Sequence, residues 1–450
     1  MTAGSNPRSP CFAALVVAPL RRALAAAGLA VLAVGTQAQS THGAAGGTAA
    51  APERAPAAQA NWLAPENLRG ALRGKRRGVP TATVRAASAE APLPMGKPVT
   101  LDALVLQLPE GRSASFDQYL ADNQIDALLV LHRGRVVYER YFEGMDARDA
   151  HAWASMSKSL IGLLAAQLIE EGRLEPSAPL ARYVPELADT PLGQASVQRN
   201  LDMEVALAYP PQLPPDLGLF TAAGLLPARA GMPDTIQDFL RTATRPVQAP
   251  HGSLFYYQNA ATEAVAWALQ RVTGRPLAAL VSERIWRPMG AQDDAEYSVD
   301  RQGTAFASGG LFSTLRDVAR FGELVRNQGR VDGRQAVSAA AVARIRQAPS
   351  AANQQRLAQA GRAQLGYGNF WWHPMESAGA LYASGRFGQR LVVDPTHEIT
   401  IAQFGAYADT RARSVTAGPV TAAAVDTLRD TEGLVALARA VAARVAETNP

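Results

Sequence analysis

The chain has 450 residues, of which 48% are apolar and 18% are charged, a composition typical of a globular protein with one large domain or two. Its net charge of +5 is uneven, because residues 1–97 hold eleven of the 44 basic and three of the 39 acidic residues, which leaves 33 and 36 from residue 98 onwards. The later part is therefore close to neutral and offers no basic stripe, so we expect no nucleic-acid partner.

The N-terminal residues 1–38 have the pattern of a secretory signal peptide. Arg21 and Arg22 precede the apolar run 23–34, and small residues follow at the cleavage positions. The apolar run is too short for a permanent membrane span, so we expect a periplasmic or secreted protein without a stable membrane anchor. An uncleaved anchor and twin-arginine export are the alternatives.

Residues 39–97 are rich in Ala, Gly, Pro and Thr and lack hydrophobic periodicity. We expect a flexible linker there, with at most a few ordered residues around Trp62 and Leu63. From residue 98 the pattern becomes regular, and we expect one folded domain over residues 98–450.

The predicted elements of this domain begin with two runs rich in β-formers around a polar turn at Arg133-Gly134, which indicates a hairpin. Helical periodicity then dominates until residues 380–404, which have the pattern of three strands. The hairpin strands are expected at 127–131 and 136–142, and helices at 155–171, 235–242, 259–272, 277–286, 315–327 and, closing the domain on the sheet, 434–446.

Strands thus lie early and late in the domain, and helices fill its middle. This order predicts an α+β fold in which an antiparallel sheet is flanked by helices and a helical lobe is inserted over roughly residues 173–290. The helix that starts at Ser155 would begin at the seam between sheet and lobe, where pockets commonly form.

A Ser-x-x-Lys pair stands at the start of that helix. Lys158 is one of three lysines and the only one after Lys97, whereas other basic positions are almost all arginine. Three residues apart on a helix, Ser155 and Lys158 share one face, and a buried amine can act as a base where a guanidinium cannot. The pair is a candidate nucleophile and base. The alternative is a surface helix start, with Ser155 as its cap and Lys158 solvated.

Two further segments supply groups that acyl transfer needs. Tyr257-x-Asn259 offers a phenol, and a phenolate stabilised by Lys158 would accept a proton and return it to a leaving group. Ser384-Gly385-Arg386 lies at a predicted hairpin turn, where a backbone N–H would form half of an oxyanion hole with the amide of Ser155. Packing aromatics and an ordinary glycine hairpin are the alternatives.

A third run, Gly309-Gly310-Leu311-Phe312-Ser313-Thr314 with Asp317, shows no chemistry of its own. It has the pattern of a tight turn followed by a helix capped by Ser313 or Thr314. The single cysteine, Cys11, excludes an intrachain disulfide, and no histidine pair has metal-ligand spacing, so we expect no metal site.

Over about residues 127–404 the chain resembles the serine β-lactamase-like hydrolases. The resemblance is carried by four motifs in this order: Ser-Met-Ser-Lys, Tyr-x-Asn, the Gly-Gly…Ser-Thr…Asp run and Gly-x-x-Gly-Gln. This superfamily includes class C β-lactamases, D-stereospecific peptidases and family VIII carboxylesterases. The local sequences ASMSKSLIG, YGNFWW and ASGRFGQ are most similar to its 6-aminohexanoate-dimer hydrolases. The resemblance implies a β-lactamase/transpeptidase-like fold.

The resemblance also implies a role for each motif residue. Ser155 matches the acylated nucleophile, Lys158 its base partner and Tyr257 the proton-relaying tyrosine. The others match groups around the substrate: Asn259 helps to hold the lysine and the substrate carbonyl, Arg386 gives the second oxyanion N–H beside Ser384 and Gly385, and Tyr209 matches a substrate-covering tyrosine.

One departure from the family pattern bears on the substrate. β-Lactamases and D,D-peptidases carry a Lys- or His-Thr-Gly triplet where this chain has Ala383-Ser384-Gly385, so the cation that recognises a substrate carboxylate is missing. The guanidinium of Arg386 is the alternative candidate for a cation that would bind a substrate carboxylate. The departure argues against penicillin as the natural substrate.

We therefore expect a secreted serine hydrolase that needs no cofactor and cleaves a small-molecule amide or ester through an acyl-enzyme on Ser155. A short-chain carboxylesterase, a D,D-peptidase or β-lactamase, and a non-catalytic penicillin-binding-like module are the alternatives. The acyl group, the leaving group and the oligomeric state are not readable from the sequence.

Overall fold

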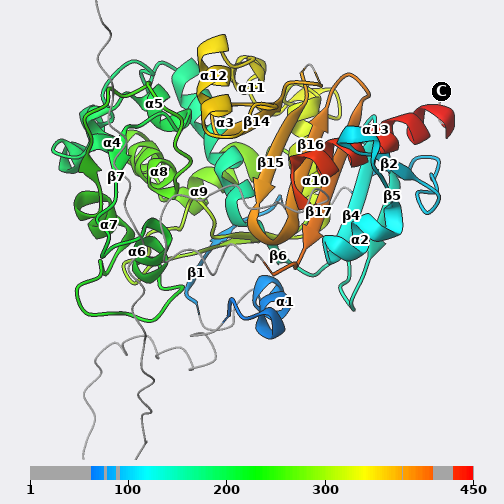
Figure 1. Cartoon of the computed structure of the whole chain (residues 1–450), viewed down its shortest axis with the longest axis horizontal. Coiled ribbons are helices and arrows are strands. Elements are labelled where there is room, and N and C mark those ends of the chain that lie inside the picture. The colour runs from blue at the N-terminus through cyan, green and yellow to red at the C-terminus, as the bar shows by residue number, and fades with distance from the viewer. Residues whose placement is uncertain (1–61, 75–78, 88–91, 378, 409–428, 449–450) are drawn as a thin grey trace, which may run out of the picture. The chain divides into compact units, whose positions relative to one another are not determined.

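An antiparallel sheet of seven strands, in the order β13-β14-β15-β16-β17-β4-β5, organises the part of the chain that the structure describes (Figure 1). The structure is a computed structural model that describes residues 62–74, 79–87, 92–377, 379–408 and 429–448. The strands are β4 (Ile125–His132), β5 (Arg135–Tyr141), β13 (Leu365–Gly368), β14 (Trp371–Pro374), β15 (Leu381–Gly385), β16 (Gln389–Asp394) and β17 (Ile399–Gly405).

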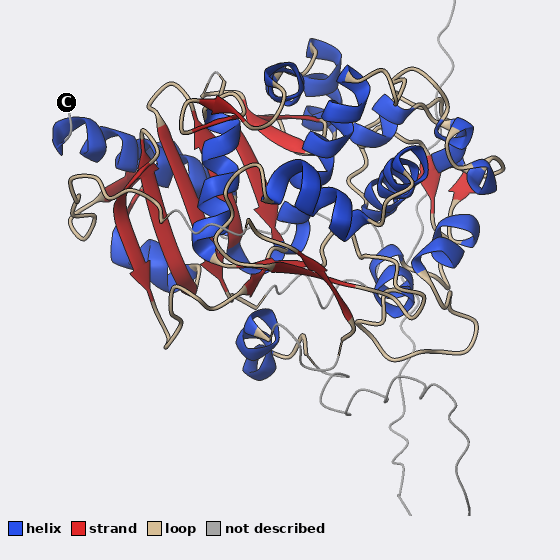
Figure 2. Ribbon diagram, turned by 180° about the vertical axis from the view of Figure 1, so that it is seen from behind, coloured by secondary structure: helices blue, strands red, loops and turns tan. Residues whose placement is uncertain are grey.

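Helices cover both faces of this sheet (Figure 2). Alternate residues of β4 face opposite sides, as the pleat of a strand requires. Leu129 and Leu131 join the core shared with α3 and α10, whereas Leu128 and Val130 join the core shared with α2 and α13. These helices are α2 (Phe116–Asp122), α3 (Ser157–Glu170), α10 (Leu315–Arg326) and α13 (Thr431–Thr448).

The middle of the chain forms the helical lobe. Its longest helix, α8, is buried along most of its length and packs against α3, which connects the lobe to the sheet. The lobe also contains a two-stranded ribbon, β7 (Leu207–Ala208) with β8 (Arg245–Pro246). Its helices are α4 (Pro191–Gln194), α5 (Val197–Leu201), α6 (Pro215–Ala222), α7 (Ile236–Thr242), α8 (Asn259–Thr273) and α9 (Leu277–Val281), which a π-helical turn extends over Ser282–Trp286.

A second antiparallel sheet has the order β1-β9-β10-β6. Its strand β6 runs directly into the segment that holds Ser155. The strands are β1 (Thr81–Val84), β6 (His151–Ala152), β9 (Ala295–Ser298) and β10 (Leu311–Ser313). The remaining elements are the ribbons β2 (Val105–Gln107) with β3 (Ser113–Ser115) and β11 (Arg330–Val331) with β12 (Arg334–Gln335), and the helices α11 (Ala339–Arg346) and α12 (Ala351–Gln359).

The segment before residue 98 corrects the sequence prediction. Residues 62–74 and 79–87, expected within the flexible linker, belong to the folded domain: α1 (Pro65–Arg73) buries Leu68 and Leu72, and β1 pairs with β9. Two apolar side chains one helical turn apart and a four-residue strand are too short a pattern to stand out in an Ala- and Pro-rich background. Other parts of the expected linker, and the expected signal peptide of residues 1–38, lie outside the described residues.

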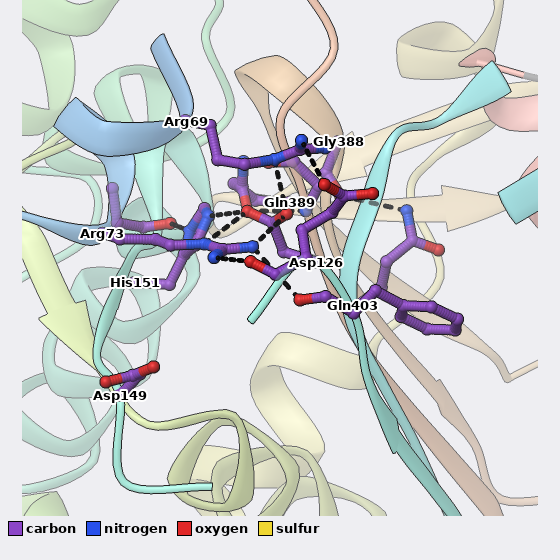
Figure 3. A network of polar contacts seen from close by, with 12 residues as sticks. Arg69, Arg73, Asp126, Asp149, His151, Gly388, Gln389 and Gln403 are labelled. Carbon is purple, nitrogen blue, oxygen red and sulfur yellow. Dashed lines mark hydrogen bonds and ion pairs between the residues drawn. The ribbon is translucent and has the colours of Figure 1, made fainter. Parts of the chain in front are cut away.

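Two arginines of α1 form ion pairs with an aspartate of the main sheet. Arg69 Nε lies 2.8 Å from Asp126 Oδ1, and Arg73 Nε donates to Asp126 Oδ2 at 3.0 Å. Figure 3 shows both arginines converging on Asp126, and Nε2 of His151, from β6, lies 3.2 Å from the same carboxylate. Although burial of Asp126 acts to raise its pKa, the bonds from His151 and Arg73 hold that pKa below its usual value.

The other predicted elements are confirmed with small shifts at their ends. The hairpin, the three strands of residues 380–404 and the closing helix lie where the pattern placed them, and α13 packs on the sheet. The helix expected from residue 155 begins at Ser157, preceded by a 3₁₀ turn over Ala154–Met156. The α+β prediction, with an antiparallel sheet, flanking helices and a helical insertion, is correct.

Candidate active site

Ser155 and Lys158 meet at the start of α3. The 3₁₀ turn places Ser155 at the surface of a pocket, whereas Lys158, in the first turn of α3, is only 1% exposed. The amine of Lys158 donates one hydrogen bond to Ser155 Oγ at 2.8 Å and another to the carbonyl oxygen of Ser308 at 2.8 Å. The spacing read from the sequence therefore produces a direct contact, and the solvated surface lysine is excluded.

Burial determines the protonation of this lysine. Desolvation lowers the pKa of Lys158 to about 7, while the negative charges of Glu263 and Asp216 act in the opposite direction. Neither carboxylate forms an ion pair with it within the described residues. A neutral amine is therefore accessible near pH 7, and a neutral amine 2.8 Å from a hydroxyl can accept its proton.

Tyr257 completes the group around the serine. It lines the same pocket as Ser155, which acts to lower its pKa, and its ring centroid lies 5.2 Å from the amine of Lys158. Burial raises the pKa of Tyr257 to about 12. The expectation of a phenolate stabilised by Lys158 is therefore wrong, because desolvation of the phenolate outweighs the groups that lower this pKa, which are Ser155 and Arg362 and not Lys158.

The backbone before Ser155 is tightly held. Ala154 has a φ of 47°, in the left-handed region that residues with a side chain rarely adopt. On its N-terminal side, Trp153 donates its backbone N–H to Leu311 O at 2.8 Å and its indole N–H to Ser313 Oγ at 2.7 Å. Strained residues persist only where the surroundings enforce them, and they are frequent at functional sites.

The end of β15 lies against this backbone. A Cβ on Gly385 would overlap the carbonyl oxygen of Trp153 and lie 3.1 Å from Cβ of Ala154. Glycine is therefore required for the close approach that brings Ser384, Gly385 and Arg386 to the same pocket as Ser155. Ser384 Oγ accepts a hydrogen bond of 2.8 Å from Arg390.

The side chain of Arg386 points to an acid of the helical lobe. Its guanidinium lies 3.4 Å from Asp216 Oδ2 on α6, and Asn259 Nδ2 donates to the other oxygen of Asp216 at 3.2 Å. Lys158 bonds to Ser155 and Ser308, so the expected contact of Asn259 with the lysine is replaced by one with Asp216.

Tyr209 lies outside the group that lines the pocket. It follows β7, donates its hydroxyl to Gln258 Oε1 at 3.2 Å and packs against Tyr256 and Phe239. In this arrangement it supports the segment before Tyr257, and the structure does not bring it over Ser155.

Several residues of the site could not be predicted from the sequence. Trp372 of β14 stacks on Tyr257 with ring centroids 5.6 Å apart, and Arg362 lies 5.2 Å above the ring of Trp372. Both line the pocket. The sequence YGNFWW indicates only a local likeness to the family, and a lone arginine in a loop belongs to no motif. The buried Glu263, described below, was missed for the same reason.

Comparison with known protein families agrees with this geometry. The family model for Beta-lactamase matches residues 114–417, most of the chain. The chain therefore belongs to the beta-lactamase family, and it is a serine hydrolase of that superfamily.

Individual members of the family show how similar this chain is to proteins with a named activity. The 6-aminohexanoate-dimer hydrolase of Paenarthrobacter ureafaciens is 31% identical over 374 residues, which are 80% of this chain and 92% of that protein. A solved structure of a "putative 6-aminohexanoate-dimer hydrolase" from Bacillus anthracis is 30% identical and covers 87% of this chain and 98% of its own, with a TM-score of 0.75. Esterase EstB of Burkholderia gladioli is 27% identical over 40% of this chain and 49% of its own.

The described residues show neither a metal-binding cluster nor a membrane-spanning helix. They contain no group of three or more His, Cys, Asp or Glu placed to hold a metal ion. Within the same ranges, no helix has both the length and the apolar character needed to cross a bilayer.

Proposed function

We propose that the chain cleaves an amide or ester bond through an acyl-enzyme on Ser155. The observation that carries this proposal is the 2.8 Å hydrogen bond from the buried amine of Lys158 to Ser155 Oγ, with Tyr257 lining the same pocket. A hydroxyl with an amine and a phenol around it has the nucleophile, the base and the proton donor that acyl transfer requires.

In the proposed acylation step, Ser155 Oγ attacks the carbonyl carbon of the substrate and its proton passes to the neutral amine of Lys158. The backbone N–H groups of Ser155 and Arg386 donate to the oxyanion that forms. When this intermediate collapses, the bond to the leaving group breaks, and Tyr257 gives its proton to the departing nitrogen or oxygen. The ammonium of Lys158 then returns a proton to Tyr257.

Deacylation repeats these steps with water as the nucleophile. The neutral amine of Lys158 accepts the proton of the attacking water, the bond from Ser155 Oγ to the acyl carbon breaks, and Tyr257 gives its proton to Oγ and takes one back from the ammonium of Lys158. Each turnover therefore consumes one water and releases an acid together with an amine or an alcohol. The reaction as proposed uses side chains of this chain and no cofactor.

We propose a linear amide of an amino acid as the substrate class. A relative that matches over 92% of its own length carries the name 6-aminohexanoate-dimer hydrolase, and such a dimer is an amide with a free carboxylate. Four arginines line the pocket in its described part, against one acid, Asp430. Arg362 is exposed, lies over Trp372 and acts on Tyr257 electrostatically, which places a cation beside the reacting groups.

Hydrolysis rates for matched substrates test the substrate class. We expect an amide of 6-aminohexanoate with a free carboxylate to be cleaved with a higher kcat/KM than a capped form in which a methyl group replaces the carboxylate. Arg362→Gln should raise the KM of the acidic form about tenfold and leave the capped form unchanged. Arg275→Gln, an exposed arginine paired with Glu283, is the matched control. Equal kcat/KM for both forms would overturn the acidic substrate.

A short-chain carboxylesterase is the second candidate, because one acyl-enzyme serves esters and amides and because Esterase EstB is among the relatives. Cleavage of p-nitrophenyl acetate or butyrate without cleavage of any linear amide would favour it. A D,D-peptidase or β-lactamase is a weaker candidate: Ala383, which replaces the usual cation, is buried in the core. A non-catalytic penicillin-binding-like module would show no covalent adduct at all.

We also propose export, on the basis of the apolar run and small-residue segment within residues 1–38. Expression of the full chain in a Gram-negative host, followed by intact mass of the periplasmic fraction, tests it. A protein shortened near residue 38 is expected. Full-length protein confined to the cytoplasm would contradict the proposal.

A further inference from the structure

A buried glutamate of the helical lobe holds the turn that contacts Lys158. Glu263 lies on α8, one turn after Asn259, and is 3% exposed. Its Oε1 accepts the backbone N–H of Ser308 at 2.7 Å, and its Oε2 accepts that of Ala307 at 3.0 Å. The carbonyl oxygen of the same Ser308 accepts the hydrogen bond from the amine of Lys158.

The turn of Ala307 and Ser308 directly precedes the run that begins at Gly309 and Gly310, to which the sequence assigned no chemistry. Gly310 N–H donates to Phe306 O at 2.8 Å, and a Cβ on Gly310 would overlap Phe306 O and Ser298 Oγ. The turn therefore packs against Ser298 of β9 and is also bound by the carboxylate of Glu263. Its position, and with it that of Ser308 O, depends on the carboxylate.

We propose that Glu263 is a positioning residue of the reaction: by binding the N–H groups of Ala307 and Ser308, it holds Ser308 O where that oxygen orients the amine of Lys158 toward Ser155. The inference rests on the proposed function, since Lys158 needs an orientation only if it moves a proton. Glu263 itself touches neither substrate nor reacting atoms and acts through the turn and through its charge.

The charges around this pair determine the expected pH behaviour. Lys158 from α3, Tyr297 from β9 and the turn face Glu263, while Asp216 from α6 and Tyr257 face Lys158. Burial raises the pKa of Glu263 to about 7, and Lys158 opposes this rise. Because the carboxylate in turn raises the pKa of Lys158, removing the charge should lower the pKa of the amine further.

The matched control is Asp317. It too is a buried carboxylate that binds two successive backbone N–H groups, those of Gln292 at 2.8 Å and Asp293 at 3.0 Å, but the acids that act on Lys158 are Glu263 and Asp216. Glu263→Gln and Asp317→Asn each turn one oxygen into an NH₂ that faces a backbone donor. Both should therefore lower the melting temperature, and only the first should change the amine.

Two measurements separate the roles. The first is the pH dependence of the rate at which a fluorophosphonate labels the protein. For Glu263→Gln we expect a maximal rate at least tenfold lower and a midpoint about one pH unit more acidic than in the wild type. Glu263→Asp, which keeps the charge, should have a midpoint close to that of the wild type. Asp317→Asn should keep both the wild-type rate and midpoint.

The second measurement does not depend on activity. The chain has three lysines, so a titration of protein labelled with [ε-¹³C]lysine gives at most three signals, and loss of one in Lys158→Met assigns it. An acid shift of the Lys158 midpoint in Glu263→Gln and none in Asp317→Asn is expected. An unchanged midpoint, or the same shift in both variants, would overturn the proposal. Absence of labelling in the wild type would instead count against the proposed function.

Discussion

The amine of Lys158 donates a hydrogen bond of 2.8 Å to Oγ of Ser155 from a position that is almost completely buried. An ammonium in that position lacks the water that would stabilise it, and this makes the proton transferable. Burial of Lys158 therefore makes the amine reactive and lowers the stability of the fold at the same time.

Replacement of Lys158 tests both sides of this relationship. Lys158→Arg keeps the charge but removes the base, and we expect hydrolysis to fall by at least about 10³-fold. Lys158→Met should be as inactive, yet its melting temperature should rise by a few degrees, because a buried amine is replaced by an apolar side chain of similar length. Thermal denaturation of folded, inactive Lys158→Met is the measurement, and a lower melting temperature would contradict the account.

The pH dependence of that stability difference has a definite sign. The pKa of Lys158 is about 7 in the folded protein and 10.5 is its ordinary value, so between these values the unfolded chain binds more protons. Wild-type stability from this group therefore rises with pH over that window. The advantage of Lys158→Met should be largest below pH 7 and shrink as the pH approaches 10.5.

Acylation should depend on pH in the same sense. The base is the neutral amine, so the rate should rise with pH, level off above about 7 and fall about tenfold per unit below that midpoint. Tyr257 should not titrate in this range, since burial raises its pKa to about 12. Stopped-flow burst amplitudes and rates with an activated ester measure the profile. A rate that is flat from pH 5 to 9 would exclude Lys158 as the base.

Gly385→Ala tests the contact between β15 and the nucleophile segment. The added Cβ would overlap Trp153 O, so either β15 or the turn must move. A displacement of about 1 Å in the oxyanion region should reduce kcat about 10²-fold. Gly70→Ala, in α1 with no atom near the added Cβ, is the matched control and should leave kcat unchanged while stabilising α1 by about 0.5–1 kcal/mol. Unchanged kcat in Gly385→Ala would show that the contact is not needed.

Truncation tests the role of the folded segment before residue 98, which holds α1 and β1. A chain starting at residue 62 should keep the stability and activity of the longer protein. A chain starting at residue 98 loses Arg69 and Arg73, which leaves the buried Asp126 with His151 alone, and it uncovers Phe387 next to Arg386. We expect a loss of at least about 3 kcal/mol in unfolding free energy and reduced activity, by urea denaturation and ester hydrolysis. Equal stability of the two chains would restore the linker interpretation.

The sequence predicted the parts of this fold that depend on local periodicity. Strands β4, β15, β16 and β17 and helices α8 and α13 follow from alternation and helical spacing. Short elements such as β6 and β9 did not, because two to four residues carry too little pattern. The segment before residue 98 was misjudged for a related reason: what orders α1 is a buried aspartate that lies more than 50 residues later.

The site, like the fold, has parts that local sequence spacing predicts and parts that it does not. Ser155 and Lys158 were predictable because three residues on a helix share a face. Contacts that depend on tertiary packing were not: Asn259 turns to Asp216, Tyr209 lies outside the pocket lining, and the acid that holds the lysine turn is Glu263. Nothing in the sequence around these residues states which segment they will meet.

The central claim, a nucleophilic Ser155, is tested most directly by intact mass after treatment with a fluorophosphonate. Wild-type protein from residue 62 onwards should gain one adduct, peptide mapping should place it on Ser155, and Ser155→Ala should gain none while keeping its circular dichroism spectrum and melting temperature. Folded wild-type protein without an adduct, or an adduct that persists in Ser155→Ala, would contradict the account.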